Sequence, residues 1–516
     1  MTGGTAGVAA PARRWDRVGD AVRSAVGSRT FLAVVVALYA AQAAWIALLA
    51  RPSIYDETYH LYAATAFSDE LLPFATQDAD DHGVGDIERY PSYLYHYLAS
   101  FPWRWFDHWD RDDRITLVRL VSVVVVALAL VVWQRVIRAM GAGAASANVA
   151  VAAVSAAPTL VFLGGTVTND VLLFLTTAWF TLAALRVYQS PTVDLGRWAT
   201  LLLALGLVGV TKFSVLPYAA FVMAAVLVRQ ALLLRRLGRS GVSMPRPATR
   251  AARFRWALLV LGAVVGVALL VERFGVNLVV YGTPLPDCGQ VHDVATCSQW
   301  LPWGRNLRLD ASFPDLAVTP SLVVTFFSSV WLPRMIWLWN AIGVVGPGNV
   351  ALTSAGPEVA GVVVLGGAFT LVAVLVLLLP LLGRENGPLM LLGGSLAFGV
   401  ALFVVNLVDY RTLGQPVGVH GRYVLAVFPV LVGAATIAVS RALGGATLWK
   451  GLLVLLLTVA ASQGGGAIAF LTQSTPDWWA HRPALVEVHE RLAHVARVVV
   501  LEDDLVRDPR LNPSSP

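Results

Sequence analysis

Residues 55–60 read Tyr-Asp-Glu-Thr-Tyr-His and follow directly on the first long apolar run of the 516-residue sequence. Two adjacent carboxylates and an imidazole are costly to place beside a membrane-length apolar segment, and ionisable groups in that position mark a functional site by default. The stretch therefore predicts an active site at a membrane surface, built around Asp56.

The composition is that of an integral membrane protein. Hydrophobic residues make up 57% of the sequence, charged residues 14%, and the mean hydropathy is +0.67. These values exclude an ordinary soluble protein. The formal net charge of +6 does not indicate a nucleic-acid partner, because the basic residues gather in a few loops between apolar runs.

The apolar runs predict an all-α, polytopic membrane protein with about eleven transmembrane helices. The first run is expected to be a retained span, because no cleavage-site pattern follows it. The expected spans are 30–50, 115–137, 145–163, 171–188, 198–210, 214–234, 256–274, 358–382, 388–408, 423–443 and 448–471.

Loop charge predicts the orientation of these spans. The segment 229–255 contains eight arginines and no acid, which places it in the cytoplasm, whereas 51–114 contains thirteen acids and five arginines, which places it outside. We therefore expect a cytoplasmic segment at 1–29, a transmembrane domain at 30–472 with outer loops at 51–114 and 275–357, and a short extracytoplasmic tail at 473–516. The aromatic density of the first outer loop favours juxtamembrane helices in the headgroup layer.

Cys288 and Cys297 are the only cysteines, so a cysteine-rich metal site is excluded. Both fall in the second outer loop. An oxidising compartment favours a disulfide between them, with a structural role worth about 2–3 kcal/mol of local ordering.

Further polar insertions interrupt the apolar runs on the predicted outer side. They read Thr-Val-Thr-Asn-Asp at 166–170, Thr-Lys-Phe-Ser at 211–214, Asp-Tyr-Arg at 409–411 and His-Gly-Arg-Tyr at 420–423. Lys212 either extends to the membrane interface or meets an anion. Arginine on the outer side departs from the usual charge distribution, so Arg411 and Arg422 need a specific reason to be there.

Taken together, these motifs resemble the GT-C superfamily. The resemblance rests on the Asp-Glu pair after the first span, the Tyr-Pro-Ser-Tyr-Leu-Tyr stretch at 90–95, Asn-Asp at 169–170, Thr-Lys-Phe-Ser at 211–214 and the late Gly-Arg-Tyr, and it covers residues 30–471. Asp-Glu-x-x-His and His-Gly-Arg-Tyr also resemble a poorly characterised bacterial membrane-protein family of that superfamily. One departure is Tyr90-Pro91-Ser92, where relatives often have His-Pro-Pro.

The resemblance implies a bacterial plasma-membrane glycosyltransferase with its active site on the extracytoplasmic face. Its donor would be a polyprenyl-phosphate-linked sugar, and its acceptor would be a hydroxyl group of a cell-envelope glycan, a lipid or a protein. Membrane lipids would surround the enzyme. Such transfer needs a base for the acceptor proton and cations for the departing phosphate.

We assign the catalytic roles to the first motif. Asp56 is the expected base, although an aspartate that only caps a helix is an alternative. Glu57 could position the acceptor, and His60, one helical turn from Asp56, could orient that carboxylate. Glu88 or Asp86 could supply a second carboxylate, or could simply be solvated.

The substrate-binding set is assigned mainly by charge. Arg422 is the best phosphate clamp, because a guanidinium group offers a bidentate fork, and Lys212, Arg411 and His420 follow it. We also include His96, Asp170 and Tyr423. The outer-loop acids leave a divalent cation open as a cofactor, but no ligand spacing identifies its site.

Two other functional classes remain open. The same spans could form a transporter or lipid flippase that uses its carboxylates as an ion relay, for which Glu272-Arg273 is the best candidate, or a scaffold without activity. The acids cluster in an outer loop and the two halves show no repeat. Both features favour the enzyme.

Overall fold

The computed structural model describes residues 14–53, 56–74, 84–244, 249–346, 349–354, 371–372, 375–377, 379–382, 386–443 and 468–501. Seven helices within these ranges are long and apolar enough to cross a membrane, or eight if a bent pair counts as one span. The predicted class, an all-α multi-pass membrane protein, is confirmed. The expected spans at 358–382 and 448–471 lie largely outside the described residues.

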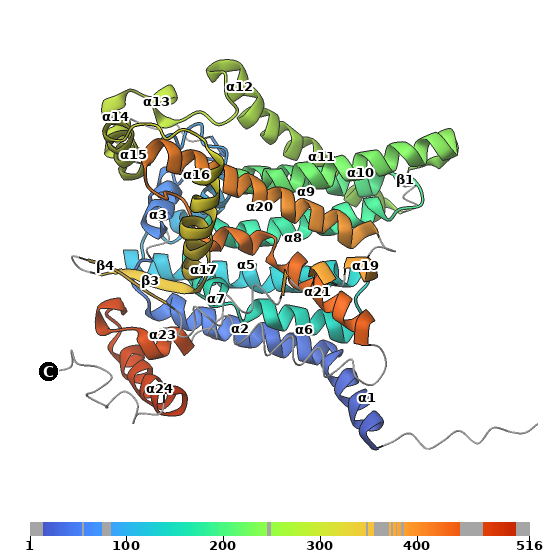
Figure 1. Ribbon diagram of the computed structural model, residues 1–516, viewed down its shortest axis with the longest axis horizontal. Helices are drawn as coiled ribbons and strands as arrows, with labels where there is room; N and C mark the ends of the chain where they lie inside the picture. Colours follow the sequence, from blue (N-terminus) through green and yellow to red (C-terminus); the bar gives the residue numbers. More distant parts are fainter. Residues whose placement is uncertain are drawn as a thin grey trace, which may run out of the picture.

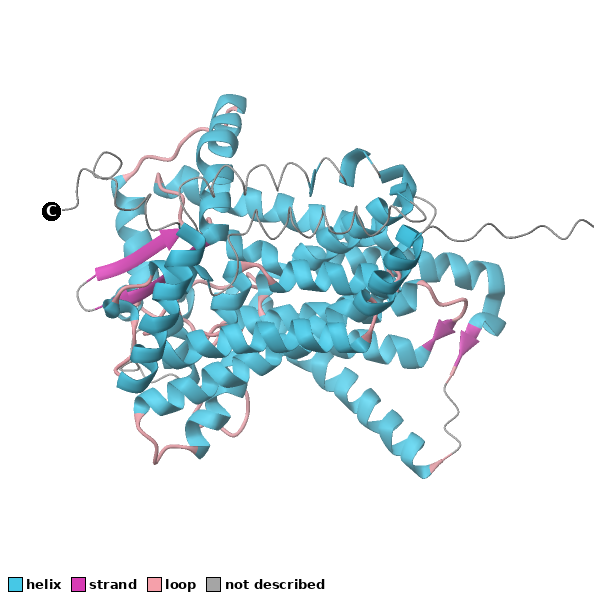
Figure 2. Ribbon diagram, turned by 90° about the horizontal axis from the view of Figure 1, so that it is seen from below, coloured by secondary structure: helices cyan, strands magenta, loops and turns pink. Residues whose placement is uncertain are grey.

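The long helices are α2 (Arg29–Leu49), α5 (Arg111–Ala139), α8 (Asn169–Tyr188), α10 (Leu216–Leu237), α11 (Arg250–Leu270) and α20 (Asn386–Leu413). Two shorter apolar helices, α9 (Leu195–Thr211) and α21 (Phe428–Leu443), correspond to the predicted spans at 198–210 and 423–443. The helices run side by side, as Figures 1 and 2 show, with α5 against α8, α9 against α11 and α10 against α20. Their common core includes the fully buried rings of Trp133, Phe162, Phe174 and Tyr218.

The expected span at 145–163 is broken into α6 (Ala144–Ser155) and α7 (Pro158–Gly164), which meet at an angle of 71°. Pro158 begins α7, and the residue before a proline is restricted to extended conformations. Ala157 has φ −62° and ψ 119°, so α6 cannot continue through it.

The helix at 320–339 was placed by sequence in an outer loop, yet it has the length and hydropathy of a span. It consists of α16 (Pro320–Thr325), the π-helical η4 (Phe326–Trp331) and α17 (Leu332–Asn340). In Figure 1 these segments run across one end of the long helices, at the left of the view. This arrangement places α17 against the segment that contains the motif at 420–423.

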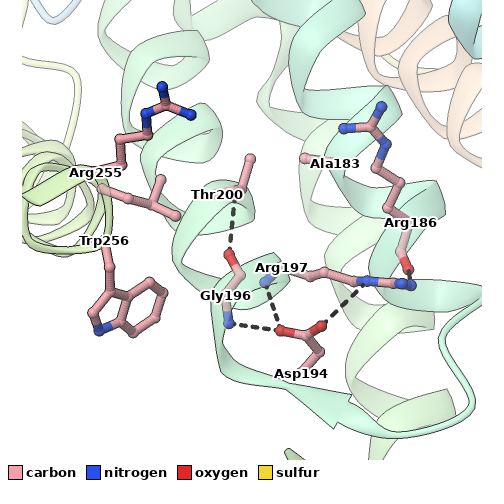
Figure 3. Close-up of a pocket in the computed structure, with 9 residues that line it drawn as sticks. Ala183, Arg186, Asp194, Gly196, Arg197, Thr200, Arg255 and Trp256 are labelled. Carbon is pink, nitrogen blue, oxygen red and sulfur yellow. Dashed lines mark hydrogen bonds and ion pairs between the residues drawn. The ribbon is translucent and has the colours of Figure 1, made fainter. Parts of the chain in front are cut away.

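Strands are few in the described ranges, and they lie at opposite ends of the helices in Figure 2. Near α17, β3 (Ala341–Gly346) and β4 (Asn349–Ser354) pair in antiparallel fashion, which the all-α prediction did not include. At the other end, β1 (Val193–Asp194) pairs in parallel with β2 (Val242–Ser243). There Asp194 caps α9 by accepting from the backbone N–H groups of Gly196 and Arg197 (Figure 3).

The remaining elements are short or peripheral. They are α1 (Arg14–Val26), α3 (Glu57–Ala66), α4 (Leu94–Trp105), η1 (Phe213–Val215), η2 (Gly238–Gly241), η3 (Val271–Gly275), α12 (Val276–Tyr281), α13 (Cys288–Val291), α14 (Val294–Gln299), α15 (Leu301–Ser312), α19 (Leu379–Leu382), η5 (Gly421–Ala426), α23 (Ile468–Gln473), η7 (Pro476–Trp478) and α24 (Pro483–Leu501).

Candidate active site

A polar cavity of about 610 Å³ is lined by residues of α3, α15 and α17. These three helices lie at the left of Figure 1. Its wall combines the motifs at 56–60 and 420–423 with residues from the segments 51–114 and 275–357. The lining residues are Asp56, Tyr59, His60, Tyr90, Asn169, Lys212, Trp300, Pro302, Arg305, Arg334, Leu338, Gln415, Pro416, Val417, Gly418, Val419, His420, Arg422 and Tyr423.

Asp56 stands at the cavity wall, immediately before α3. Its φ of 61° makes it the only non-glycine residue with a positive φ in the described part of the chain. A left-handed conformation at a non-glycine residue costs energy and is often retained at functional sites. The side chain is 57% exposed, makes no capping hydrogen bond to α3, and accepts from Arg422 Nη2 at 2.7 Å. The helix-capping alternative for Asp56 is therefore not observed.

Arg422 lies in η5 and connects two carboxylates. Besides its bond to Asp56, its Nε lies 3.6 Å from Asp170 Oδ2, although the side chain is only 7% exposed. His420 caps η5 by accepting from the backbone N–H of Arg422 through Nδ1, at 3.1 Å. Between them, Gly421 lies directly against α17, where an added Cβ would come within 2.4 Å of Met335 O. The glycine of the Gly-Arg-Tyr motif thus permits this contact.

Lys212 completes the charged network from the opposite side. It follows the end of α9 and is almost buried, and its Nζ donates to Asp170 Oδ1 at 2.5 Å. The same ammonium group lies 4.9 Å from the centre of the Tyr423 ring. Asp170, at the start of α8, therefore contacts both Lys212 and Arg422. We call Asp56, Arg422, Asp170 and Lys212 the open network, because three of the four line the cavity.

Glu57 has a different environment from its neighbour Asp56. Its side chain is fully buried and does not line the cavity. Arg119 of α5 holds it with two bonds of 2.8 Å, and the backbone N–H groups of Ser53 and Val167 donate to it at 2.6 and 2.8 Å. Arg119 also donates to the carbonyl groups of Ala47, Ala50 and Arg51 at the end of α2. We call Glu57 and Arg119 the sealed network.

The histidines beside the open network are buried. His60 Nδ1 and His96 Nε2 lie 2.8 Å apart, with His60 at the cavity and His96 behind it. Burial, together with Lys212 and Arg422, lowers the pKa of His60 well below its ordinary value. Burial, the neighbouring His60 and Lys212 lower the pKa of His96 as well. Burial and Arg422 lower the pKa of His420 to about 2, so all three imidazoles are neutral at pH 7.

Two predicted site residues lie away from the cavity. Arg411, at the end of α20, is partly exposed and pairs with Asp315 at 3.0 Å, where it joins α20 to the second outer loop. Glu88 is half-buried and does not line the cavity, and its backbone carbonyl accepts from Arg273. Sequence position placed both residues at the correct end of the molecule. It could not show which way their side chains point.

Arg305 and Arg334 line the cavity but were not expected there. Both are exposed, and neither forms an ion pair with a carboxylate in the described part of the chain. With Lys212 and Arg422 they give the site four cationic side chains, against the two carboxylates of Asp56 and Asp170. The site therefore has an excess of two positive charges. Arg334 lies within the aromatic run at 326–339, so the sequence did not indicate a role for its charge.

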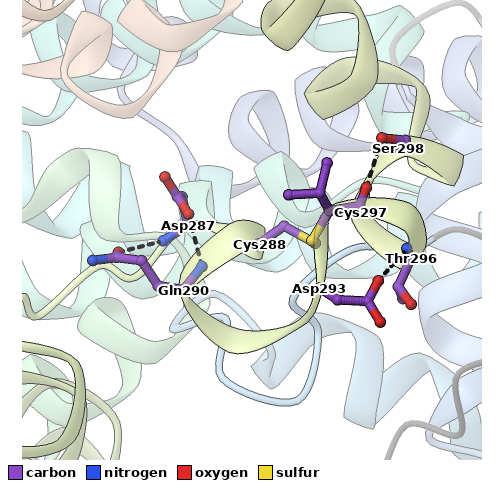
Figure 4. Close-up of a disulfide and its surroundings, with 8 residues drawn as sticks. Asp287, Cys288, Gln290, Asp293, Thr296, Cys297 and Ser298 are labelled. Carbon is purple, nitrogen blue, oxygen red and sulfur yellow. Dashed lines mark hydrogen bonds between the residues drawn. A yellow bond between two sulfur atoms is a disulfide. The ribbon is translucent and has the colours of Figure 1, made fainter.

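The disulfide-bonded loop contributes an aromatic wall. Cys288 and Cys297 are bonded as predicted, and Figure 4 shows the two short helices that they join. Trp300 follows directly, and its ring stacks on that of Tyr59 with centroids 6.1 Å apart. The ring also covers Gly85, whose φ is 73° and where an added Cβ would come within 2.4 Å of it. The bridge thus anchors the segment that brings Trp300 to the cavity.

Two polar atoms at this wall have no hydrogen-bond partner among the described residues. They are the indole Nε1 of Trp300, a donor, and the amide Oδ1 of Asn169, an acceptor. Buried polar groups are almost always hydrogen-bonded, so such atoms beside a cavity suit a ligand that carries hydroxyl groups. Asn169 belongs to the Asn-Asp motif found in the sequence, whereas nothing in the sequence singled out Trp300.

Within the described residues, no group of three or more His, Cys, Asp or Glu side chains is arranged to hold a metal ion. The acids of the disulfide loop serve as helix caps. Asp287 accepts from the backbone N–H of Gln290 at 3.0 Å, and Asp293 accepts from that of Thr296 at 2.7 Å (Figure 4).

The sequence matches no protein-family model and no curated protein. Solved structures similar to the chain include ArnT from Cupriavidus metallidurans bound to undecaprenyl phosphate. That match has 15% identity and a TM-score of 0.47, and it covers 93% of this chain and 73% of that one.

The oligosaccharyltransferase of Archaeoglobus fulgidus in the apo form is also similar, with 13% identity and a TM-score of 0.40. The archaeal oligosaccharyltransferase AglB from Archaeoglobus fulgidus, in complex with an inhibitory peptide and a dolichol-phosphate, has 12% identity and a TM-score of 0.38. The chain spans 59% and 58% of the chains in these two structures.

Proposed function

We propose that this protein is a membrane glycosyltransferase that moves a sugar from a polyprenyl-phosphate donor to the hydroxyl group of an extracytoplasmic acceptor. The observation that carries the proposal is the open network, in which an exposed carboxylate contacts a cation at the wall of a cavity. The cavity lies at the end of membrane-length helices. A lipid-linked donor could therefore enter it from the bilayer.

The cations suit the phosphate of such a donor. Arg422 and Lys212 are held in place by Asp56 and Asp170, so their positions do not depend on the substrate. Arg305 and Arg334 add charge that no acid in the described part of the chain balances. Together they would stabilise the negative charge that develops on the departing phosphate, which makes polyprenyl phosphate a better leaving group. Arg422 keeps the role of principal clamp.

Asp56 is the strongest candidate base at this cavity. The lowered pKa values of His60 and His420 make both imidazoles poor proton acceptors at neutral pH, whereas Asp56 is an exposed carboxylate beside them. In the proposed step, the acceptor oxygen attacks the anomeric carbon and Asp56 takes its proton. The bond from that carbon to the phosphate oxygen breaks, and polyprenyl phosphate leaves with the electron pair.

The aromatic wall would hold the sugar. Tyr59 and Trp300 offer a stacked apolar surface, while Trp300 Nε1 and Asn169 Oδ1 could bond to hydroxyl groups. Ligand sites generally combine an apolar lining with a few placed polar groups in this way. His60, with His96 behind it, and Tyr423 would complete the wall of this subsite.

Glu57, Glu88 and Arg411 receive structural roles in this proposal. Glu57 already accepts four hydrogen bonds, so it has little capacity left to bind an acceptor. Arg411 would position the outer loop through Asp315, and the carbonyl of Glu88 would anchor the first outer loop on Arg273.

The outer face is the proposed location of this site. The cavity end carries the acid-rich loop at 51–114 and the disulfide, which fits an oxidising compartment. The arginine-rich segment at 229–255 lies at the other end of α10 and α11.

The transporter alternative is less well supported. A relay would need ionisable groups along the bundle, but the buried charged side chains in the described ranges all belong to the cavity end. They are Glu57, Asp86, Arg119, Asp170, Lys212, Arg273 and Arg422. Glu272 and Arg273, the relay candidates, contact Arg89 and the first outer loop.

The proposal can be tested with purified protein in proteoliposomes that contain radiolabelled polyprenyl-phosphate sugars. We expect a glycosidic product together with release of polyprenyl phosphate, and its loss in Asp56→Asn. Movement of the donor across the bilayer without any product would favour the flippase instead. Mass spectrometry of lipids that co-purify with the protein would identify the donor to use first.

A further inference from the structure

A second cavity, of about 390 Å³, lies at the end of the molecule opposite the active site. It is formed where α8 ends and where α9 and α11 begin. Figure 3 shows Arg186 and Arg255 on either side of Thr200, with their guanidinium groups toward the same side of the cavity. The proposed glycosyl transfer does not use this cavity.

The charge of this cavity is only partly balanced. Arg197 is fixed in place, because its Nε lies 3.4 Å from Asp194 Oδ2 and its Nη1 donates to the carbonyl of Arg186 at 2.9 Å. The side chains of Arg186 and Arg255 form no ion pair with an acid among the described residues, and both are exposed. Two guanidinium groups therefore remain for an anion, and they come from different helices.

The cavity also has an apolar part and lies at a membrane boundary. Trp256 and Leu259 form one side of it. Arg186 stands in the last turn of α8, a candidate span, and Arg255 near the start of α11, another such span. Both positions correspond to the headgroup layer, where tryptophan is enriched. A lipid would use both parts of the cavity, whereas a soluble anion would use the arginines alone.

We propose that this cavity binds the phosphate group of an anionic phospholipid from the adjacent leaflet. Basic pockets between transmembrane helices are suited to such headgroups. Arg186 and Arg255 would contact the phosphate, and Trp256 and Leu259 would contact the glycerol and upper acyl region. Arg235 and Arg236, in the last turn of α10, are also exposed but do not line the cavity, so they serve as a matched comparison.

The test uses the full-length protein in detergent, titrated with dioleoyl phosphatidylglycerol or dioleoyl phosphatidylcholine and followed by native mass spectrometry. Wild type should retain phosphatidylglycerol preferentially. The double variant Arg186→Gln/Arg255→Gln should bind it about 25-fold more weakly, at about fivefold for each arginine. The control Arg235→Gln/Arg236→Gln removes the same charge and should change the affinity by less than about threefold. If the first double variant does not fold, Arg255→Gln alone should give the fivefold loss.

Two results would overturn the proposal. Equal losses in the two double variants would mean that the lipid responds only to the overall charge of this end. Displacement of phosphatidylglycerol by millimolar inorganic phosphate would mean that the cavity takes a free anion. Turnover is not part of either readout, so failure of the proposed transferase activity would leave this test intact.

Discussion

Asp56 and Glu57 are neighbours in the sequence, yet the open and sealed networks that contain them have little else in common. Glu57 is fully buried, and its partners are the guanidinium group of Arg119 in α5 and the backbone N–H groups of Ser53 and Val167. Asp56 is more than half exposed, has a strained backbone and meets a cation at a cavity wall. A satisfied, buried ion pair holds structure together, whereas an accessible carboxylate beside a cation can exchange a proton with a substrate.

The largest effect on stability is expected in the sealed network. Glu57→Gln leaves Arg119 buried without its counter-charge, which should lower the free energy of unfolding by about 3–5 kcal/mol. Thermal unfolding in detergent would measure the loss. The control Glu487→Gln breaks an exposed pair with Arg491 and should cost about 0.5 kcal/mol or less. Similar melting temperatures for the two variants would contradict the structural role of Glu57.

Asp86 is buried like Glu57, but it has no cationic partner in the described part of the chain. Burial, with a further contribution from Asp287, raises the pKa of Asp86 from 3.8 to about 7. The folded state therefore keeps a proton that the unfolded chain loses, and stability should fall as the pH rises from about 4 to about 7. The difference could reach about 4 kcal/mol.

Asp86→Asn tests this pH dependence, because an amide does not titrate. The variant should melt at a higher temperature than wild type at pH 8, and its melting temperature should change less between pH 5 and pH 8. An unchanged slope in the variant would show that other groups control the stability in this range.

Arg422 tests the cationic side of the open network. Arg422→Ala should weaken donor binding by roughly 10-fold to 100-fold and slow transfer, since charge-assisted hydrogen bonds contribute about 1.5–3 kcal/mol. Arg422→Lys should restore only part, because lysine lacks the planar fork. Arg411→Ala removes the same charge from an exposed pair at the same end and should bind the donor normally. Equal losses of donor affinity in Arg422→Ala and Arg411→Ala would contradict the role of Arg422 as the phosphate clamp.

The smallest effect on turnover is expected from the disulfide, which touches neither network directly. The double variant Cys288→Ser/Cys297→Ser should have a looser loop around Trp300 and a modestly lower melting temperature. Turnover should fall less than about tenfold, because Asp56 and Arg422 lie on other segments. Complete loss of turnover in a folded protein would show that the loop does more than hold the aromatic wall.

The membrane fold was predictable because a long apolar run has few stable conformations other than a membrane-spanning helix. The broken span at 145–163 has a proline at its break. The motifs also identified much of the cavity, including Asp56, Lys212, His420, Arg422 and Tyr423. Their shared predicted side of the membrane was enough to bring them together in the prediction.

The partners of individual charges were not predictable. Arg119 is separated from Glu57 by 62 residues and stands in an apolar span, so the sequence could not say which of two adjacent carboxylates it would take. The choice depends on how α2, α3 and α5 meet. In the same way, the path of α17 across the bundle determines that Arg334 lines the cavity while Arg411 faces Asp315.

The role of Asp56 as the base can be tested by measuring turnover and donor affinity together in Asp56→Asn, per folded molecule. The variant keeps the size of the side chain and removes its basicity, so turnover should fall on the order of 10²–10⁴-fold while the polyprenyl-phosphate sugar still binds. Glu57→Gln, assayed below its melting temperature, should retain far more activity than Asp56→Asn. Near-normal turnover in Asp56→Asn would contradict the assignment of Asp56 as the base.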